Sequence, residues 1–294
     1  MEKDEIEILI FVSQSRDYIL PHTSAILQDR LGLSKKCLAF DVGLGCTAFV
    51  YGLSIINSLI SLGKIKKGLL LMGDISSNGS YRDKSSYPLF GDAGTATACI
   101  FDETAPESFY NLQTDGAGYD AIIAPTGGNR NKFFKKALVY KKIEDGIYRN
   151  AANVVLNGIE VFNFALREVA PNVVSLLEYA NTDIRTIDHF VLHQANKLMN
   201  NTIRMKLKAP KDKFPLSLDK YGNTSSATIP VTIVSELRDQ VSNSELNMLF
   251  SGFGVGLSWG SVLTQTKNMV CPEMLIYEDH IKHLNQNKYH YKVK

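Results

Sequence analysis

Short apolar runs alternate with longer stretches of helical periodicity along the chain. Residues 6–13 and 187–192 are apolar runs with the length and composition of buried strands. Residues 158–181 differ, because their apolar side chains recur at helical spacing, as at Ile159, Phe162, Leu166 and Val169. Strand and helix patterns in alternation predict a layered α/β protein.

Three landmarks of the first part of the chain recur at a nearly constant separation in the second part. An apolar strand at 6–13 recurs at 187–192. A glycine turn that opens a helix at 45–47 recurs at 222–224, and a strand that ends in glycine at 68–73 recurs at 247–252. The recurrence predicts two copies of one supersecondary unit. We place the first half at 1–150 and the second at 151–267, followed by a tail over 268–294.

The repeat also predicts a deficit in the first half. By the same separation Met1 corresponds to about Thr182, so the helical stretch at 158–181 has no counterpart. We expect either that the two halves differ or that the chain begins late.

Composition, net charge and cysteine spacing argue against several classes of protein. The chain has 294 residues, of which 45% are hydrophobic and 21% charged, as in ordinary globular proteins. A formal net charge of +2 argues against a dedicated nucleic-acid binder. No signal peptide opens the sequence, and no apolar run approaches the length of a membrane span. The four cysteines lie far apart, without zinc-like spacing, so we expect no metal site and a cytoplasmic protein with reduced thiols.

Cys46 is the candidate nucleophile. It follows a strand that runs into Gly43-Leu44-Gly45, and it precedes an apolar helix. The positive end of a helix dipole is expected to lower the pKa of a thiol in this position. Most lone cysteines, by contrast, are inert core residues. The strand–glycine–helix turn favours the reactive interpretation, since such turns present a side chain above a sheet.

His193 and Asn223 are the candidate partners of this thiol. His193 ends a predicted strand, where ligands bind in open α/β sheets. Asn223 lies in a Gly-Asn turn, which is ordinarily a turn or a helix N-cap. The repeat places Asn223 opposite Cys46, so we expect thiol, imidazole and amide to meet in one cleft.

The glycine cluster at 252–256 lacks the Lys-Ser/Thr pair of a phosphate loop and the full dinucleotide pattern. We interpret it as close backbone approach to a reacting centre, with an amide donated to an oxyanion.

A set of motifs in this order is similar to β-ketoacyl-acyl-carrier-protein synthase III. The similar segments are Gly-Cys-Thr-Ala-Phe-Val-Tyr-Gly-Leu at 45–53, Leu-Phe-Gly-Asp-Ala-Gly at 89–94, Asn-Gly-Ile-Glu-Val-Phe at 157–162, His-Gln-Ala-Asn at 193–196, Gly-Asn-Thr-Ser at 222–225 and Gly-Phe-Gly-Val-Gly-Leu-Ser-Trp-Gly at 252–260. The resemblance is collinear from about Ile6 to about Leu263.

The resemblance implies a thiolase-like fold: two pseudo-symmetric halves in an α-β-α-β-α layered core, assembled as a homodimer. It implies a catalytic triad of Cys46, His193 and Asn223, with the backbone amides of Cys46 and Val255 as the oxyanion hole. Acyl-CoA would acylate the cysteine, and malonyl-acyl-carrier protein would then lose carbon dioxide and attack the acyl thioester. No permanently bound cofactor is implied.

The resemblance alone implies roles for several further residues. Asn196 would help to position the pantetheine arm, and Leu20 matches a position that shapes the acyl pocket of the partner subunit. Leu198 replaces an arginine that meets the carrier protein. Four basic residues nearby are candidates for docking its acidic surface, although such clusters are more often a solvated face: Lys197, Arg204, Lys206 and Lys208.

Two other departures affect the expected fold. The family's N-terminal segment, which carries an interior strand of the first half and a tryptophan that stacks on the adenine of coenzyme A, has no counterpart before Met1. We therefore expect a chain that begins late; if it begins at Met1, we expect a gap in the first sheet, where an interior strand would be lacking. Val255 replaces a glycine and is expected to restrict the local backbone. The tail histidines His280, His283 and His290 lie beyond the resemblance.

Two other functions remain open from the sequence. An acyl-cysteine enzyme of this kind can pass its acyl group to an alcohol or an amine, in secondary metabolism or polysaccharide modification. Alternatively, the deficit at the start allows a truncated or inactive scaffold subunit. Release of carbon dioxide from malonyl-carrier protein distinguishes condensation from the first alternative.

Overall fold

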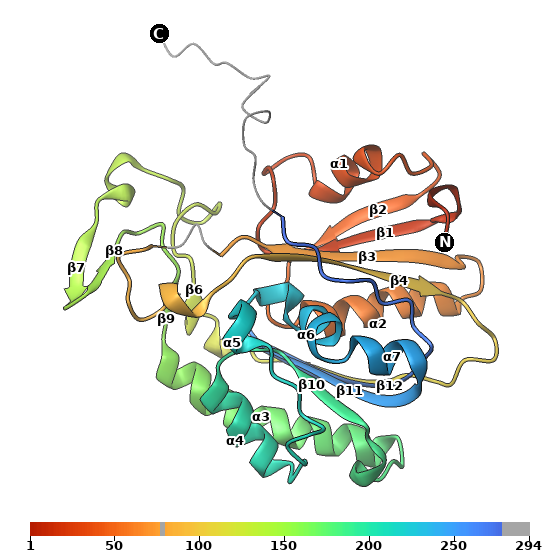
Figure 1. The fold of residues 1–294 in the computed structure, drawn as a ribbon. Helices are drawn as coiled ribbons and strands as arrows, with labels where there is room; N and C mark the ends of the chain where they lie inside the picture. Colours follow the sequence, from red (N-terminus) through yellow and green to blue (C-terminus); the bar gives the residue numbers. More distant parts are fainter. Residues whose placement is uncertain (77–79, 278–294) are drawn as a thin grey trace.

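Two four-stranded sheets lie face to face in the computed structural model, which describes residues 1–76 and 80–277 (Figure 1). The first sheet has the order β2-β1-β3-β4, with β1 parallel to both of its neighbours and β4 antiparallel to β3. Its strands are β1 (Ile8–Val12), β2 (Leu38–Val42), β3 (Lys67–Asp74) and β4 (Ala93–Ile100).

The second sheet has the order β10-β11-β12-β5, with β10 parallel to β11 and the other pairs antiparallel. Its strands are β5 (Phe109–Thr114), β10 (His189–Leu192), β11 (Glu245–Gly254) and β12 (Ser258–Lys267). Strand β5 precedes residue 150 in the sequence, so the range 1–150 includes one strand of the second sheet.

The helices form three layers, one between the two sheets and one on the outer face of each sheet. Helices α2 (Ala48–Ser61) and α6 (Thr228–Glu236) lie between the sheets, and α1 (Thr23–Arg30) covers part of the first sheet's outer face (Figure 1). Helices α3 (Gly158–Tyr179) and α4 (Lys197–Lys206) cover the outer side of the second sheet. The five-layered thiolase-like arrangement predicted from the sequence is therefore confirmed.

The remaining elements are short. Two further antiparallel pairs are β6 (Ile122–Ile123) with β9 (Val155–Leu156) and β7 (Lys141–Glu144) with β8 (Ile147–Arg149), and the second pair contacts the segment after β3. Helices α5 (Leu218–Tyr221) and α7 (Arg238–Asn243) flank α6. Short 3-10 turns complete the described elements, at Lys3–Glu5, Tyr87–Leu89, Gly116–Gly118, Lys135–Leu138, Ile184–Thr186 and Ser225–Ala227.

Burial between the sheets holds the halves together. The central cluster joins side chains of β1, β3 and α2 to side chains of α6, β10 and β11. Phe49 of α2 meets Phe250 of β11 edge to face, with ring centroids 5.3 Å apart. Buried aromatic pairs add to the free energy of apolar burial, so the cluster fixes α2 against the second sheet.

The predicted repeat is visible in the strand pairing. The parallel pair β1–β3 corresponds to β10–β11, and the antiparallel neighbour β4 corresponds to β12. The predicted gap in the first sheet is wrong, because β1 is hydrogen-bonded on both sides, to β2 and to β3. By the same correspondence, the counterpart of β5 would lie beyond β4, at an edge of the sheet, where a missing strand interrupts no pairing.

The described part of the tail returns to the core. Met269 donates its backbone N–H to the Val241 carbonyl at 2.8 Å, and its side chain packs with Cys271 against the central cluster. The three tail histidines lie outside the described residues. Within the described ranges, no helix has the length and apolar character needed to cross a membrane.

Candidate active site

Cys46 lies between β2 and α2, at the inner face of both sheets. Thr47 begins the helix, and its hydroxyl lies 3.0 Å from the hydroxyl of Ser258 on β12. Gly254 at the end of β11 faces the cysteine so closely that a Cβ there would stand 2.7 Å from the thiol sulfur. Gly254 also has φ +156°, so this position requires glycine for both space and conformation. The end of β11 thus forms one wall of the site.

The predicted lowering of the Cys46 pKa is wrong. Burial raises the pKa of the thiol to about 11, although the residue keeps some exposure to solvent. Hydrogen bonds from the backbone N–H groups of Val255 and Cys46 oppose this effect, and the nearby Asp74 carboxylate adds to it. Desolvation therefore outweighs the donors at the helix start, and Cys46 is a neutral thiol at pH 7.

His193 follows β10 and is almost completely buried, with 1% of its surface exposed. Its backbone N–H donates to the Ser251 carbonyl at 2.7 Å, which fixes the residue to β11. Phe253 meets the imidazole edge to face at 5.6 Å, and Nδ1 lies 2.7 Å from the Thr228 hydroxyl. Burial lowers the pKa of His193 to about 3, so the ring is neutral at pH 7.

Asn223 is held at both ends of its amide. Nδ2 donates to the Ala195 carbonyl at 3.4 Å, and Oδ1 accepts from the Ser225 backbone at 2.9 Å. The backbone of Asn223 pairs with the 89–91 segment, since its N–H donates to the Leu89 carbonyl at 2.8 Å. The amide carries two N–H donors, and Ala195 accepts from one of them.

These contacts bring the three predicted triad residues into one neighbourhood. Cys46 touches Gly254 of β11, and His193 is bound to Ser251 three residues earlier on the same strand. Asn223 is bound to Ala195, two residues after His193. Residues far apart in the sequence are therefore linked through the carboxyl-terminal end of β11 and the segment after β10.

Val255 occupies the predicted oxyanion position without backbone strain. Its φ is not positive, whereas Gly254 and Gly256 on either side have φ +156° and +147°. The unusual backbone conformation of this segment therefore falls on the two glycines, and Val255 does not have to adopt it. The backbone N–H groups of Val255 and Cys46 both hydrogen-bond to the Cys46 sulfur.

The other predicted residues lie around this centre with partners of their own. Asn196 caps α4 by accepting the Met199 N–H at 2.8 Å. Leu20 lies on a loop with 83% of its surface exposed.

Three of the four basic residues are engaged within the chain. Lys197 pairs with Asp219 at 2.7 Å, Arg204 donates to the Ala209 carbonyl at 3.0 Å, and Lys206 donates to the Leu166 carbonyl at 2.7 Å. Lys208 follows α4 with φ +53°.

Asp74 and Thr228 are site residues that the sequence analysis missed. Asp74 has 4% of its surface exposed, and it accepts hydrogen bonds from the Ser13 hydroxyl at 2.8 Å, the Gln14 N–H at 2.9 Å and the Ser226 N–H at 3.1 Å. It therefore ties the loop after β1 to the Asn223 segment. The sequence did contain a signal for Asp74, because an acidic residue at the end of an apolar strand is rarely buried unless it is paired. Thr228 left no such signal in the sequence.

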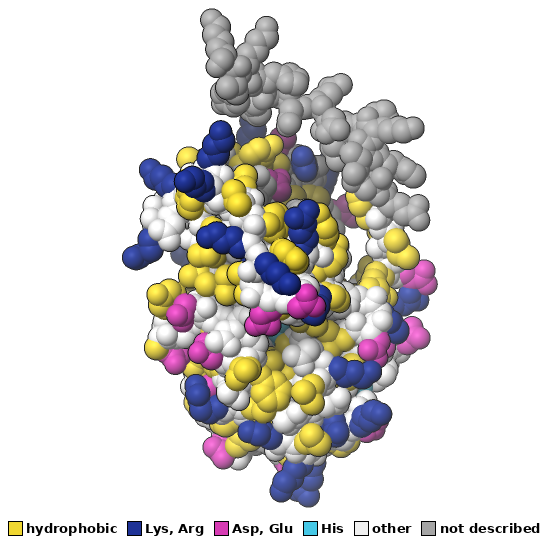
Figure 2. Space-filling view, turned by 90° about the vertical axis from the view of Figure 1, so that its left-hand side faces the viewer, with side chains coloured by type: hydrophobic (Ala, Val, Ile, Leu, Met, Phe, Trp, Pro, Cys, Tyr) yellow, Lys and Arg dark blue, Asp and Glu magenta, His cyan; other side chains and the backbone are white. Residues whose placement is uncertain are grey.

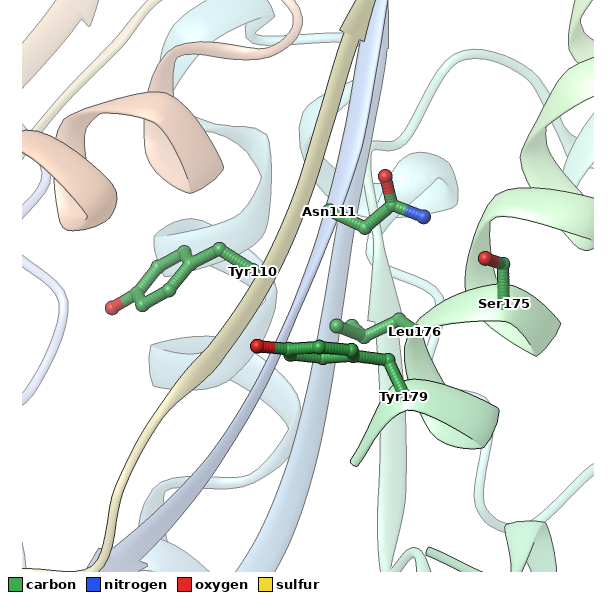
Figure 3. Close-up of a pocket in the computed structure, with 5 residues that line it drawn as sticks. All are labelled: Tyr110, Asn111, Ser175, Leu176 and Tyr179. Atoms are coloured by element: carbon green, nitrogen blue, oxygen red, sulfur yellow. The ribbon is translucent and has the colours of Figure 1, made fainter. Parts of the chain in front are cut away.

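A shallow pocket between β5 and α3 is separate from this site (Figure 3). It is lined by Tyr110, Asn111, Ser175, Leu176 and Tyr179, none of which is a predicted site residue.

Family models match both halves of the chain. Residues 40–117 match the model described as 3-oxoacyl-[acyl-carrier-protein (ACP)] synthase III, and residues 177–266 match the one described as its C-terminal part. The first match contains Cys46, and the second contains His193 and Asn223.

Curated relatives and solved structures agree with these models. The chain is 32% identical to β-ketoacyl-[acyl-carrier-protein] synthase III of Clostridium perfringens, covering 90% of this chain and 78% of the relative. The enzyme of that name from Clostridioides difficile is 33% identical, with 88% and 76% covered. A crystal structure of 3-oxoacyl-(acyl-carrier-protein) synthase III superposes with TM-score 0.86 at 35% identity, covering 90% and 79%. The Burkholderia xenovorans 3-oxoacyl-(acyl-carrier protein) synthase superposes with TM-score 0.83 at 36% identity, covering 91% and 75%.

Proposed function

The chain belongs to the β-ketoacyl-[acyl-carrier-protein] synthase III family, and we propose that it makes a 3-oxoacyl-carrier protein from an acyl-CoA and malonyl-carrier protein. The observation that supports this proposal is that Cys46 and His193 both contact β11, while Asn223 is hydrogen-bonded to Ala195, two residues after His193. The relatives are named as synthases, which favours condensation over acyl transfer to an alcohol or amine and over an inactive scaffold.

The first half-reaction forms an acyl-cysteine. Because the thiol and the imidazole are both neutral at rest, His193 removes the proton from Cys46 as the sulfur attacks the acyl-CoA carbonyl. The N–H groups of Cys46 and Val255 hold the oxyanion of the tetrahedral intermediate. Coenzyme A then leaves as the thiol, and the acyl group stays on the sulfur.

The second half-reaction forms the carbon–carbon bond. Malonyl-carrier protein loses carbon dioxide, and the resulting enolate attacks the acyl carbonyl on Cys46. His193 and Asn223 donate hydrogen bonds to the malonyl thioester oxygen, where the enolate charge develops. The cysteine leaves as the thiolate and takes a proton from water.

Substrate delivery completes the proposal. Asn196 lies in the segment that follows His193 and would position the pantetheine arm. The carrier protein is expected to dock near α4, where its acidic surface would meet Lys197 and Lys208, with Arg204 and Lys206 supporting the backbone behind them. In a homodimer, the exposed Leu20 would enter the acyl pocket of the partner subunit.

The decisive experiment compares two buried thiols. Burial raises the pKa of Cys99 to about 11, as it does for Cys46, so Cys99→Ser is a matched control for Cys46→Ser. We expect Cys46→Ser to lose at least about 1,000-fold in condensation rate and Cys99→Ser to retain it. Mass spectrometry after incubation with an acyl-CoA should show an acyl adduct on the Cys46 peptide alone.

Two results would overturn the proposal. One is an acyl adduct without release of carbon dioxide from malonyl-carrier protein, which would indicate transfer to another acceptor. The other is full condensing activity in Cys46→Ser.

A further inference from the structure

Thr228 is the first residue of α6, and it contacts the candidate catalytic histidine. Its side chain is buried, with 2% of the residue's surface exposed. The hydroxyl oxygen lies 2.7 Å from Nδ1 of His193 and 3.2 Å from the carbonyl oxygen of Ser225. Among the described residues, the hydrogen bond of the His193 ring is the one to Thr228, and the ring also meets Phe253 edge to face. The position of the hydroxyl proton therefore bears directly on the protonation of His193.

A hydroxyl carries one proton and can accept through its lone pairs. When Thr228 donates to the Ser225 carbonyl, its oxygen accepts from Nδ1–H, and Nε2 is left with a free electron pair. When Thr228 donates to Nδ1 instead, Nε2 carries the ring proton. The same oxygen thus pairs with Nδ1 in both tautomers, and the ring keeps its orientation while Nε2 changes from a base to a donor.

We propose that Thr228 is a positioning residue that holds the His193 ring and supports one tautomer in each half-reaction. This inference rests on the proposed function. In acylation, Nε2 takes the proton of Cys46 and passes it to the sulfur of the departing coenzyme A, so the neutral Nδ1–H ring is restored. Between the half-reactions, Nδ1 releases its proton to water and Nε2 takes one from water, with no net change. In condensation, Nε2–H donates a hydrogen bond to the malonyl thioester oxygen, and the ring itself transfers no proton.

A pair of threonines in α6 supplies a matched comparison. Thr232 is one turn farther along the helix and is also buried, and its hydroxyl donates to the Thr228 carbonyl at 2.8 Å. Its hydroxyl also lies 2.7 Å from that of Ser217, and no hydrogen bond joins it to His193. Thr228→Val and Thr232→Val each remove one buried, hydrogen-bonded hydroxyl from the same helix, but only the first touches the imidazole. Thr228→Ser keeps the hydroxyl.

The test combines kinetics with the nitrogen spectrum of the ring. We expect Thr228→Val to lower kcat by about 10- to 100-fold with little change in the KM for acyl-CoA. Thr228→Ser should recover kcat to within about threefold of the parent, and Thr232→Val should stay within the same margin. In ¹⁵N-histidine NMR at pH 7, with the His193 signals assigned through His193→Gln among the six histidines, the unliganded parent and Thr228→Ser should show the Nδ1–H tautomer. Thr228→Val should move toward Nε2–H.

Equal losses of kcat in Thr228→Val and Thr232→Val, or an unchanged ring spectrum in Thr228→Val, would overturn the inference. Absence of condensation in the parent protein would instead refute the proposed function, while the NMR comparison would still report on Thr228.

Discussion

The two halves share a scaffold but contribute different chemistry. In each, a glycine turn and a helix between the sheets lie in sequence between the two strands of a parallel pair. The turn of the first half carries Cys46, whose side chain faces β11, whereas the turn of the second half carries Asn223, whose amide is fixed at both ends. The thiol thus comes from one half, and Val255, one of its two backbone donors, comes from the other. The two turns are thus equivalent positions of the repeat that carry different side chains.

The outer faces of the two sheets differ more than the inner ones. Helix α3, with 22 residues, covers the second sheet, and residues such as Trp259 and Leu263 of β12 are buried. Helix α1 has only 8 residues, and alternate residues of β4 are exposed, including Ala98 and Ile100. Figure 2 shows apolar side chains mixed with basic ones on one side of the molecule. The inner face of each sheet is covered by a helix of the same kind, whereas the outer faces differ in how much of each sheet is covered.

The largest loss of activity is expected from a substitution at the contact between Gly254 of the second half and Cys46 of the first half. Gly254→Ala would place a Cβ 2.6 Å from Cβ of Cys46 in a backbone conformation that disfavours alanine, so Cys46 or β11 must move. We expect at least a 100-fold loss of condensing activity, on the order of what displacement of a reacting group by 1 Å causes. Gly43→Ala is the control in the lead-in to Cys46, since no atom lies within 4 Å of the added Cβ. Similar activities of the two variants would refute the assigned contact.

The outer faces can be compared by placing a charge on each. Ala165 of α3 is fully buried, so Ala165→Glu would bury an unpaired carboxylate and destabilise the fold by about 4 kcal/mol. Ala98 of β4 is exposed, so Ala98→Glu should cost less than about 1 kcal/mol. Urea denaturation measures both free energies of unfolding. An equally large loss in Ala98→Glu would show that this face is covered in solution.

The buried imidazole predicts a pH dependence of stability that belongs to the second half. Because the pKa of His193 is lowered from 6.5 to about 3, the unfolded chain binds a proton here that the folded chain does not, at any pH between these values. Stability is therefore present above pH 6.5 and falls as the pH drops toward 3, by up to about 3 kcal/mol at pH 4. The difference in unfolding free energy between parent and His193→Gln should shrink accordingly from pH 7 to pH 4. A constant difference would contradict the neutral, buried ring.

The smallest effect concerns a helix start. Asn196 caps α4 through its side chain, whereas Thr47 at the start of α2 makes no such bond. Asn196→Ala should cost about 1 kcal/mol, and Asn196→Ser should recover most of it. If Asn196 also binds pantetheine as proposed, Asn196→Ser should raise the KM for acyl-CoA without losing stability. Unchanged KM in both variants would leave Asn196 as a cap alone.

Much of the fold followed from local patterns. The runs at 6–13 and 187–192 are β1 and β10, and the amphipathic stretch at 158–181 is α3, because strand and helix periodicity reflect which side chains must be buried. The recurrence of the glycine turns also identified Cys46 and Asn223 as equivalent positions. The strand order of the first sheet, with β1 paired on both sides, was not predictable in this way, since strand order depends on pairing between distant segments.

For the site, the sequence by itself determined which residue types were present, namely a thiol before a helix, an imidazole after a strand and an amide in a glycine turn. Only the tertiary structure decided their protonation, because burial of Cys46 and His193 depends on packing from both halves and outweighs the local helix dipole. It also decided the roles of Asp74 and Thr228, whose partners lie in segments remote in sequence. Local sequence encodes periodicity and residue chemistry, whereas solvation and hydrogen-bond partners arise only when distant segments pack together.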